Sequence, residues 1–344
     1  MTGRQNLVLG VDSGGSGLRV ALADPSADGT ATGPAAGPYR RLAEAASREP
    51  VRTGAGGIDA GHFLEQLLPM ADRLLREADA GPVAAVAVGA AGMATLGDEL
   101  RAVLPGALAE ALGVRRLALA ADAVTAYAGA LGARPGAVVA AGTGLIALGT
   151  DLRSWRRADG WGHLLGDCGS GAWIGRAGLE AALRAHDGRR GGSQPLLARA
   201  EAALGPAAEL PGRVYPRTDR PAVLASFAPE VARCAADGDP VATGILRDAA
   251  RHIAEAAAAV APPAAAGPCE VALTGGLVRM GEVLLAPLAE ELTERLPHAV
   301  VVPAAGDPLD GALVVAGSLA TGAPGLPSDP RLLQVTAGRT GTEG

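Results

Sequence analysis

The chain has 344 residues, a net charge of −6 and 2% aromatic residues, and it contains no lysine. A general nucleic-acid binder needs a basic face for phosphates and aromatic side chains for stacking, so this composition disfavours that class. Without lysine the chain lacks the phosphate-binding loop GxxxxGK[ST], the strand lysine of protein kinases and any lysine Schiff base for pyridoxal phosphate. No apolar run approaches the ~18 residues that a membrane-spanning helix needs, and no signal-peptide pattern opens the chain. We therefore expect a cytoplasmic protein.

The first predicted element is a hairpin over residues 7–24, LVLGVDSGGSGLRVALAD, whose glycine turn carries Asp12 at its mouth. A strand follows these glycines, whereas a helix follows the GxGxxG turn of dinucleotide-binding folds. Glycines let successive N–H groups point at an anion. Asp12 would repel a bare phosphate, so a hydrated Mg²⁺ ion is expected between them. The alternative interpretation is a plain hairpin turn with a solvated aspartate.

The next elements are a helix predicted over residues 59–79 and a buried strand predicted from the apolar run 83–92. A second helix over 99–112 precedes a short strand that ends at Asp122. Phosphoryl transfer to a hydroxyl requires a base near the acceptor oxygen, and Asp122 is a candidate for it. An aspartate at this place also suits a helix cap, which is the alternative interpretation.

The opening pattern recurs at residues 136–151, GAVVAAGTGLIALGTD, and a helix-rich stretch over 173–259 follows with a loop at 188–194. A strand, a double glycine and a helix come next, and a strand and helix close the chain. Two such glycine turns would hold a triphosphate from two sides, and the double glycine would leave room for adenine. The residues expected to bind ATP are Gly14, Gly15, Ser16, Gly17, Gly142, Thr143, Gly144, Gly275 and Gly276.

This order of motifs resembles the sugar kinase, Hsp70 and actin superfamily, and within it the N-acetylglucosamine kinases and the BadF/BadG/BcrA/BcrD-type ATPases. The most specific sign is GWGHLLGDCGSGAWIG at residues 160–175, which is similar to the GWGxxxGDEGSxxWI segment of those kinases. The resemblance covers residues 7 to about 320. It implies an α/β fold of two ribonuclease-H-like (actin-like ATPase) domains around a central nucleotide and substrate cleft, with ATP and Mg²⁺ as cofactors.

The expected domains are an N-terminal ATPase-like lobe over residues 1–118 and a larger C-terminal lobe over 119–306. A closing helix over 307–321 is expected to pack back toward the N-terminal lobe, followed by a mobile tail over 322–344. We expect a homodimer that takes a small-molecule sugar and binds neither nucleic acid nor a membrane.

The resemblance also assigns roles to single residues. Asp122 matches the catalytic base of the family, and Asp12 would contact the metal through water. His163 is more typical of a packed or hydrogen-bonded residue than of a base. The residues that match the sugar-contacting segment are Gly160, Trp161, Gly162 and Asp167.

Three departures from the family pattern bear on the substrate. Cys168 stands where the family usually has Glu, and Leu145 stands where many members have Ser. The N-acetylglucosamine kinases bind the sugar partly through an Asn after the first hairpin pair, but the comparable stretch 48–57 has none. Arg52 and Thr53 are left there to serve a different sugar.

The expected function is an ATP-dependent kinase that phosphorylates a hydroxyl of a hexose or amino sugar, most simply N-acetylglucosamine to N-acetylglucosamine 6-phosphate. One alternative is a kinase for glucosamine or another hexose. Another is a BadF-type ATPase that drives electron transfer through an iron–sulfur cluster, although the scattered Cys168, Cys234 and Cys269 indicate no cluster site. A nucleotide-gated regulator without kinase activity is the third.

Overall fold

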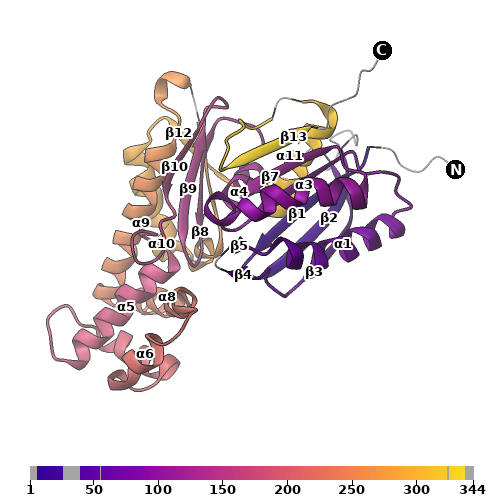
Figure 1. The fold of residues 1–344 in the computed structure, drawn as a ribbon. Helices are drawn as coiled ribbons and strands as arrows, with labels where there is room; N and C mark the ends of the chain where they lie inside the picture. The colour runs from indigo at the N-terminus through magenta and orange to yellow at the C-terminus, as the bar shows by residue number, and fades with distance from the viewer. Residues whose placement is uncertain (1–5, 26–38, 55, 268, 324, 338–344) are drawn as a thin grey trace, which may run out of the picture. The chain divides into compact units, whose positions relative to one another are not determined.

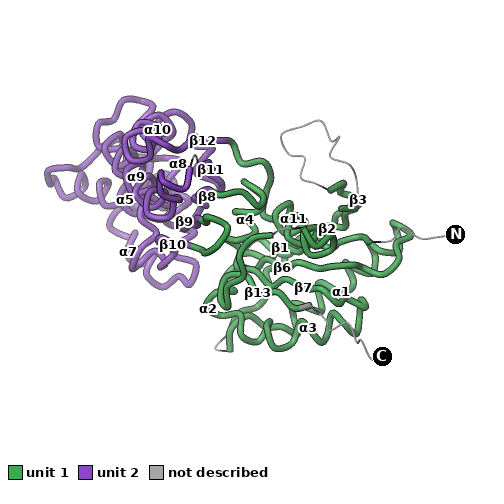
Figure 2. The backbone as a smooth tube through the Cα atoms, turned by 90° about the horizontal axis from the view of Figure 1, so that it is seen from above, with its two compact units in different colours: residues 1–135, 150–155, 303–344 green, residues 136–149, 156–302 purple. Residues whose placement is uncertain are grey.

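The computed structural model describes residues 6–25, 39–54, 56–267, 269–323 and 325–337. Figure 1 shows the chain as a ribbon, and Figure 2 shows in two colours the two compact units into which it divides. Unit 1 comprises residues 1–135, 150–155 and 303–344, and unit 2 comprises residues 136–149 and 156–302. Unit 1 thus combines the N-terminal part of the chain with its C-terminal end, whereas the sequence analysis placed the boundary at residue 118.

Unit 1 contains a six-stranded sheet in the order β13-β7-β6-β1-β2-β3. Its strands are β1 (Val8–Gly14), β2 (Gly17–Asp24), β3 (Arg40–Ser47), β6 (Ala85–Ala90), β7 (Arg116–Ala121) and β13 (Leu333–Ala337). β1, β6 and β7 run parallel, while β1, β2 and β3 form an antiparallel meander. Every residue of β6 is buried, as expected for a parallel strand covered on both faces.

The helices of unit 1 are α1 (Ala60–Glu77), α2 (Met93–Leu96), α3 (Asp98–Leu112), α4 (Asp122–Leu131) and α11 (Pro308–Thr321). A short antiparallel pair, β4 (Thr53–Gly54) and β5 (Gly57–Ile58), precedes α1. α1 packs on β2 and β3, and α11 packs on α4, β1 and β6. The α4–α11 contact requires glycine, because a Cβ on Gly129 would overlap with the carbonyl oxygen of Asp307.

Strand β13 lies in the segment that the sequence analysis assigned to a mobile tail. It pairs antiparallel with β7, with Leu333 opposite Ala120 and Ala337 opposite Arg116. Leu333 is buried, whereas Gln334 is exposed. Val335 and Thr336 are exposed as well, so these residues of the strand show no alternation of buried and exposed side chains, and the short, partly polar run carries a weak signal in the sequence.

Unit 2 contains a five-stranded sheet in the order β10-β9-β8-β11-β12. Its strands are β8 (Gly136–Ala141), β9 (Leu145–Thr150), β10 (Trp155–Asp159), β11 (Cys269–Thr274) and β12 (Ala299–Pro303). The helices are α5 (Gly171–His186), α6 (Gln194–Leu204), α7 (Leu210–Val214), α8 (Arg220–Ala236), α9 (Pro240–Val260) and α10 (Glu282–Arg295). α9 packs on β8, and α5, α8, α9 and α10 contact one another around one alanine- and leucine-rich core.

The secondary structure expected from the sequence is confirmed for most elements. The two hairpins over 7–24 and 136–151 are β1–β2 and β8–β9, and the loop expected at 188–194 separates α5 from α6. Within the part of the chain that the structure describes, no helix is both long and apolar enough to cross a bilayer.

Candidate functional site

In unit 1, the expected site residues lie at the carboxyl edge of the parallel strands. Ser13 of β1 is paired with Ala90 of β6, which is paired in turn with Ala121 of β7. The residues that follow these three positions therefore leave the sheet at the same edge. They include the glycine turn after β1 and Asp122 after β7, so the topology places both at one edge of the sheet although more than 100 residues separate them.

Asp12 lies one residue before this edge and forms an ion pair with Arg19. The two residues are direct partners in the β1–β2 register. Oδ2 of Asp12 accepts hydrogen bonds from Nε of Arg19 at 3.2 Å and from Nη2 at 2.7 Å. Burial raises the pKa of the Asp12 carboxyl, and the hydrogen bond and charge of Arg19 oppose that rise.

Arg19 also binds Asp307, the residue that caps α11. Nη1 of Arg19 donates to Oδ2 of Asp307 at 2.6 Å. The sequence analysis did not single out Arg19. A signal was present, because a hairpin with a two-residue turn at Gly15 and Ser16 places positions 12 and 19 opposite each other.

Asp122 is the first residue of α4 and the one exposed residue of that helix. The helix N-cap is Ala121, which makes no side-chain cap. Oδ1 of Asp122 accepts a hydrogen bond from the N–H of Ala123 at 2.9 Å. The carboxylate therefore supports the first turn of the helix, as the capping interpretation expects, and still faces solvent.

In unit 2, the second and third glycine elements also share one sheet edge. β8 and β11 run parallel with Thr274 paired to Ala140, so the turn after Ala141 and the turn after Thr274 lie side by side. Gly275 has a φ of +98°, and a Cβ there would overlap with the carbonyl oxygen of Ala141. These two turns could therefore contact one ligand.

The glycine turn of unit 2 is bound to the start of α5. The N–H of Gly171 donates to the carbonyl of Gly142 at 2.8 Å, and the N–H of Ala172 donates to the carbonyl of Thr143 at 3.0 Å. Ser170 caps α5 through the N–H of Trp173. The motif at residues 160–175 is thus joined to the turn expected to bind phosphate.

Asp167 makes the second connection between that motif and the turn. Its buried carboxylate accepts the N–H of Gly162 at 3.0 Å through Oδ1. The N–H of Leu145 also donates to this carboxylate. Burial raises the pKa of the Asp167 carboxyl, and these two hydrogen bonds act in the opposite direction.

Asp159 organises the same loop, and the sequence analysis missed it. Its Oδ1 accepts the N–H of Asp167 at 2.5 Å, and its Oδ2 accepts the N–H of Cys168 at 2.9 Å. Asp159 and Asp167 both have positive φ, 59° and 54°, a conformation that aspartate tolerates better than most residues. No spacing rule marks such a role, because it depends on the path of the loop.

Trp161 lies on the surface of this loop with 67% of its area exposed. The guanidinium of Arg157 stacks over the ring at 4.6 Å from its centroid and donates to the carbonyl of Gly160 at 2.7 Å. Leu164 and Leu165 are exposed as well. The loop therefore presents an aromatic and apolar surface on a backbone that its own carboxylates hold in place.

The glycines of the three turns fall into two groups. The first group is required by the packing of the chain, because an added Cβ would overlap with neighbouring atoms. Its members are Gly17, Gly144 and Gly275. The second group has φ outside the left-handed region, and a Cβ would meet no atom of the described residues within 4 Å. Its members are Gly14, Gly15, Gly142 and Gly276. The fold gives no reason for glycine at these four positions.

Among the described residues, the carboxylates at the expected site suit a metal ion that keeps most of its water ligands. No group of three or more His, Cys, Asp or Glu side chains in the described ranges is placed to hold a metal. One half-buried carboxylate, Asp12, lies beside the first glycine turn. This donor set suits a hydrated Mg²⁺ ion that a nucleotide brings with it, since such an ion keeps several waters and takes few protein ligands.

The stretch expected to contact the sugar in unit 1 is fixed by His62. Nδ1 of this buried histidine accepts the N–H of Arg52 at 3.1 Å, and Nε2 lies 3.2 Å from a carboxylate oxygen of Glu49. The side chains of Arg52 and Thr53 are exposed. A Cβ on Gly17 would overlap with the carbonyl of Ser47, so this stretch begins directly beside the first glycine turn.

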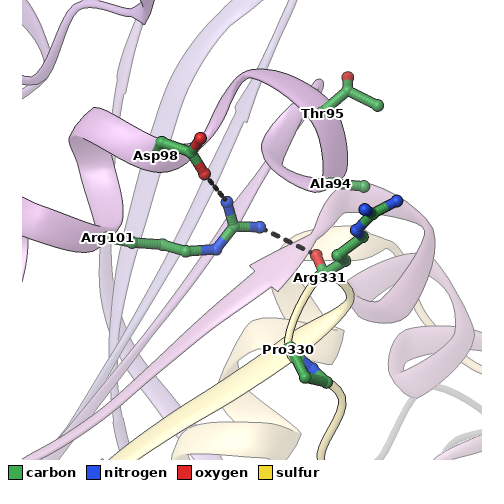
Figure 3. A pocket seen from close by; sticks show the side chains of 6 residues that line it. All are labelled: Ala94, Thr95, Asp98, Arg101, Pro330 and Arg331. Atoms are coloured by element: carbon green, nitrogen blue, oxygen red, sulfur yellow. Dashed lines mark hydrogen bonds and ion pairs between the residues drawn. The ribbon is translucent and has the colours of Figure 1, made fainter.

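A separate cavity of about 360 Å³ lies in unit 1 (Figure 3). Nη1 of Arg101 donates to Asp98 at 3.1 Å, and Nη2 donates to the carbonyl of Arg331 at 3.0 Å. The residues that line it are Ala94, Thr95, Asp98, Arg101, Pro330 and Arg331. None of the residues expected at the site is among them.

The two α/β units, each with a glycine turn between antiparallel strands, define the fold of the actin-like ATPases. The chain belongs to the BadF/BadG/BcrA/BcrD ATPase family, whose model matches residues 9–316. The expectation of this family from the motif order is confirmed.

Individual relatives point in the same direction. An N-acetylmuramic acid/N-acetylglucosamine kinase from Clostridium acetobutylicum is 29% identical over 203 residues, which cover 57% of this chain and 66% of that kinase, just under two thirds. A solved structure from Chromobacterium violaceum, provisionally assigned as an N-acetylglucosamine kinase, has 28% identity and a TM-score of 0.67 over 90% of this chain and 98% of that chain. A glucokinase of the ROK family from Streptomyces griseus, solved with glucose and AMPPNP, shares the fold at 19% identity and a TM-score of 0.51, over 92% of this chain and all of that one.

Proposed function

We propose that the protein is an ATP-dependent sugar kinase that phosphorylates a hydroxyl of a hexose or amino sugar, most simply N-acetylglucosamine to N-acetylglucosamine 6-phosphate. The observation that carries this proposal is the group of four glycines, Gly14, Gly15, Gly142 and Gly276, that the fold itself does not need. They lie in turns at the carboxyl edges of the two sheets. Glycine at such positions lets an anionic ligand come close to the backbone N–H groups.

The nucleotide would be held mainly by main-chain groups. The residues proposed to contact it are those of the turn from Gly14 to Gly17 and of the turn from Gly142 to Gly144, with Gly275 and Gly276 beside the second turn. Mg²⁺, when bound with the nucleotide, supplies charge neutralisation on the β- and γ-phosphates. Asp12 would accept a hydrogen bond from one of its waters.

Asp122 would serve as the base. Its exposed carboxylate would accept the proton of the sugar hydroxyl as that oxygen forms its bond to the γ-phosphorus, while the bond to the β–γ bridging oxygen breaks and ADP leaves.

The sugar would be bound by the loop that contains Trp161. An exposed aromatic ring offers a flat apolar surface for a face of a pyranose. The N–H of Gly162 is already bound to Asp167, whereas the carbonyl of Gly160 accepts one hydrogen bond from Arg157 and keeps a second lone pair for a sugar hydroxyl. Asp167 already accepts two backbone N–H groups, so its first task would be to hold this loop. Its remaining lone pairs would be available to a sugar hydroxyl.

The relatives support a kinase over the electron-transfer alternative, and so do the cysteines. Cys234 and Cys269 are buried in unit 2, and Cys168 is half-buried in the loop. An iron–sulfur cluster shared between two chains needs ligands that reach the surface together. The homodimer and the cytoplasmic location stay predictions, and light scattering of the purified protein would check the first.

The test is an ADP-release screen with glucose, glucosamine, N-acetylglucosamine, N-acetylmannosamine and N-acetylmuramic acid. We expect turnover with at least one of them, and Asp122→Asn should lower kcat by about 100-fold or more with unchanged nucleotide affinity. Asp98→Asn is the matched control, because Asp98 is likewise the first and an exposed residue of its helix. Nucleotide binding without turnover on any sugar would overturn the kinase and favour a nucleotide-gated regulator.

A further inference from the structure

Arg19 connects the first glycine turn to the start of α11. The guanidinium donates to Asp12 with Nε and Nη2 and to Asp307 with Nη1, at distances between 2.6 and 3.2 Å. Asp12 and Asp307 are almost 300 residues apart in the sequence. One planar cation thus joins a strand end to a helix end, a geometry that the fork of arginine permits and a single ammonium group does not.

Asp307 is itself held firmly, so it can anchor Arg19. Its Oδ1 accepts the N–H groups of Leu309 and Asp310 at 2.9 and 3.0 Å, and Oδ2 of Asp310 accepts the N–H of Asp307 in return. This is a complete capping box. Asp310 is bound in turn by Tyr39 and Arg41. The position of the guanidinium is therefore set by α11 and not by β2 alone.

The arrangement leaves one oxygen of Asp12 for another partner. Both hydrogen bonds from Arg19 fall on Oδ2, and within the described ranges Oδ1 of Asp12 has no hydrogen-bond partner. The side chain of Asp12 is 16% exposed. A carboxylate that is this deeply buried is costly to ionise without a cation beside it. Two carboxylates and one guanidinium also leave a net charge of −1, which attracts a further cation.

We propose that Arg19 is a positioning residue, which holds Asp12 by Oδ2 so that Oδ1 is presented to a water of the nucleotide-bound magnesium ion. This inference rests on the proposed function, because it assumes that the first glycine turn binds a nucleotide. It makes a specific claim about coupling: Arg19 matters for the contribution of magnesium to binding and not for the binding of the nucleotide as such.

The experiment measures the affinity of a fluorescent ATP analogue with magnesium and with EDTA, in the full-length protein and in Arg19→Met. In the unaltered protein magnesium should increase the affinity for the nucleotide. In Arg19→Met this increase should be about tenfold smaller, which corresponds to the loss of one charge-assisted hydrogen bond. The affinity measured in EDTA should differ between the two proteins by no more than about twofold. Arg41→Met is the matched control. Arg41 is as exposed as Arg19, at 31% against 33%, and binds the same helix turn through Asp310 without touching Asp12.

The other outcomes separate the two proposals. An unaltered protein that binds no nucleotide overturns the proposed function itself. An unaltered protein that binds equally well with magnesium and EDTA, or an Arg19→Met variant that keeps the full gain, overturns only the role of Arg19. Equal losses in magnesium and in EDTA would show a merely structural role and also overturn it. Arg19→Lys covers the case of misfolding: it keeps the charge without the fork, and a full magnesium gain in it would refute the bridging argument.

Discussion

The sharpest test of the site is to add one methyl group to glycines that the fold does not need. Gly15 and Gly142 have φ outside the left-handed region, and within the part of the chain that the structure describes a Cβ on either would meet no atom within 4 Å. Alanine restricts the unfolded chain more than glycine does, so each substitution should stabilise the protein by about 0.4–1 kcal/mol, or about 1–4 °C in Tm.

The same methyl group would occupy the space through which, under the proposed function, a phosphate oxygen would reach the backbone. A hydrogen bond to a charged group contributes about 1.5–3 kcal/mol, so its loss should weaken ATP binding by about 10- to 150-fold. Isothermal titration calorimetry would give the affinity, and thermal unfolding of the same samples would give the stability. The expected pattern is a protein that is slightly more stable and binds ATP poorly.

Unchanged ATP affinity in both alanine variants would refute the reasoning, since the open space at these glycines would then have no ligand. A lower Tm would refute a different step, namely that the native backbone accepts alanine there. Gly17→Ala is the contrasting variant. A Cβ at Gly17 would overlap with the carbonyl of Ser47 and its φ is +123°, so it should lose stability whether or not a nucleotide binds.

Three further predictions concern the framework of the site. Asp159→Asn should speed chymotryptic cleavage of the Trp161 loop several-fold, because both carboxylate oxygens of Asp159 accept N–H groups and asparagine keeps only one acceptor oxygen. Asp151→Asn is the control, since a single oxygen of Asp151 accepts both of its hydrogen bonds. Gly129→Ala should lower the free energy of unfolding by about 1–3 kcal/mol, because the added Cβ would overlap with Asp307. Gly106→Ala, at an exposed helix position with open space, should raise it by about 0.5–1 kcal/mol. Urea unfolding measures both changes. Burial, then the bond to Asp310, raises the pKa of Tyr39. The unfolded state therefore loses this proton first, and Tyr39→Phe should reduce the fall in stability measured above about pH 10.

The two hairpins were predictable because their signal is local. Strand-like runs lie on both sides of the glycine turns at residues 14–17 and 142–144. Two such runs joined by a short glycine turn are typical of a β-hairpin. The position of Asp122 beside the first turn is not local. It follows from the parallel pairing of β1, β6 and β7, which sequence patterns suggest only through the general rule that carboxyl ends of parallel strands share an edge.

Two residues of the site were out of reach of pattern reasoning for different physical reasons. Asp307 is contacted by Arg19 because α11 returns to β1 after the whole of unit 2, and no periodicity records that return. Asp159 acts through both carboxylate oxygens on the backbone of a loop, and its positive φ is set by the loop itself. β13 was missed because one buried side chain, Leu333, carries most of its apolar signal.

The hydrogen bonds of unit 2 imply that the turn from Gly142 to Gly144, proposed to contact phosphate, and the loop from Gly160 to Cys168, proposed to contact the sugar, behave as one body. The start of α5 binds the carbonyls of Gly142 and Thr143, and Asp167 accepts N–H groups from Leu145 on one side and Gly162 on the other. The turn that would contact the nucleotide and the loop that would contact the sugar both donate hydrogen bonds to the carboxylate of Asp167. A displacement of the turn is therefore expected to shift the loop as well. Such a body can keep donor and acceptor groups in register during phosphoryl transfer, which depends on positioning more than on covalent chemistry. The identity of the side chain at Cys168 does not affect this connection, since only the backbone N–H of Cys168 takes part in it.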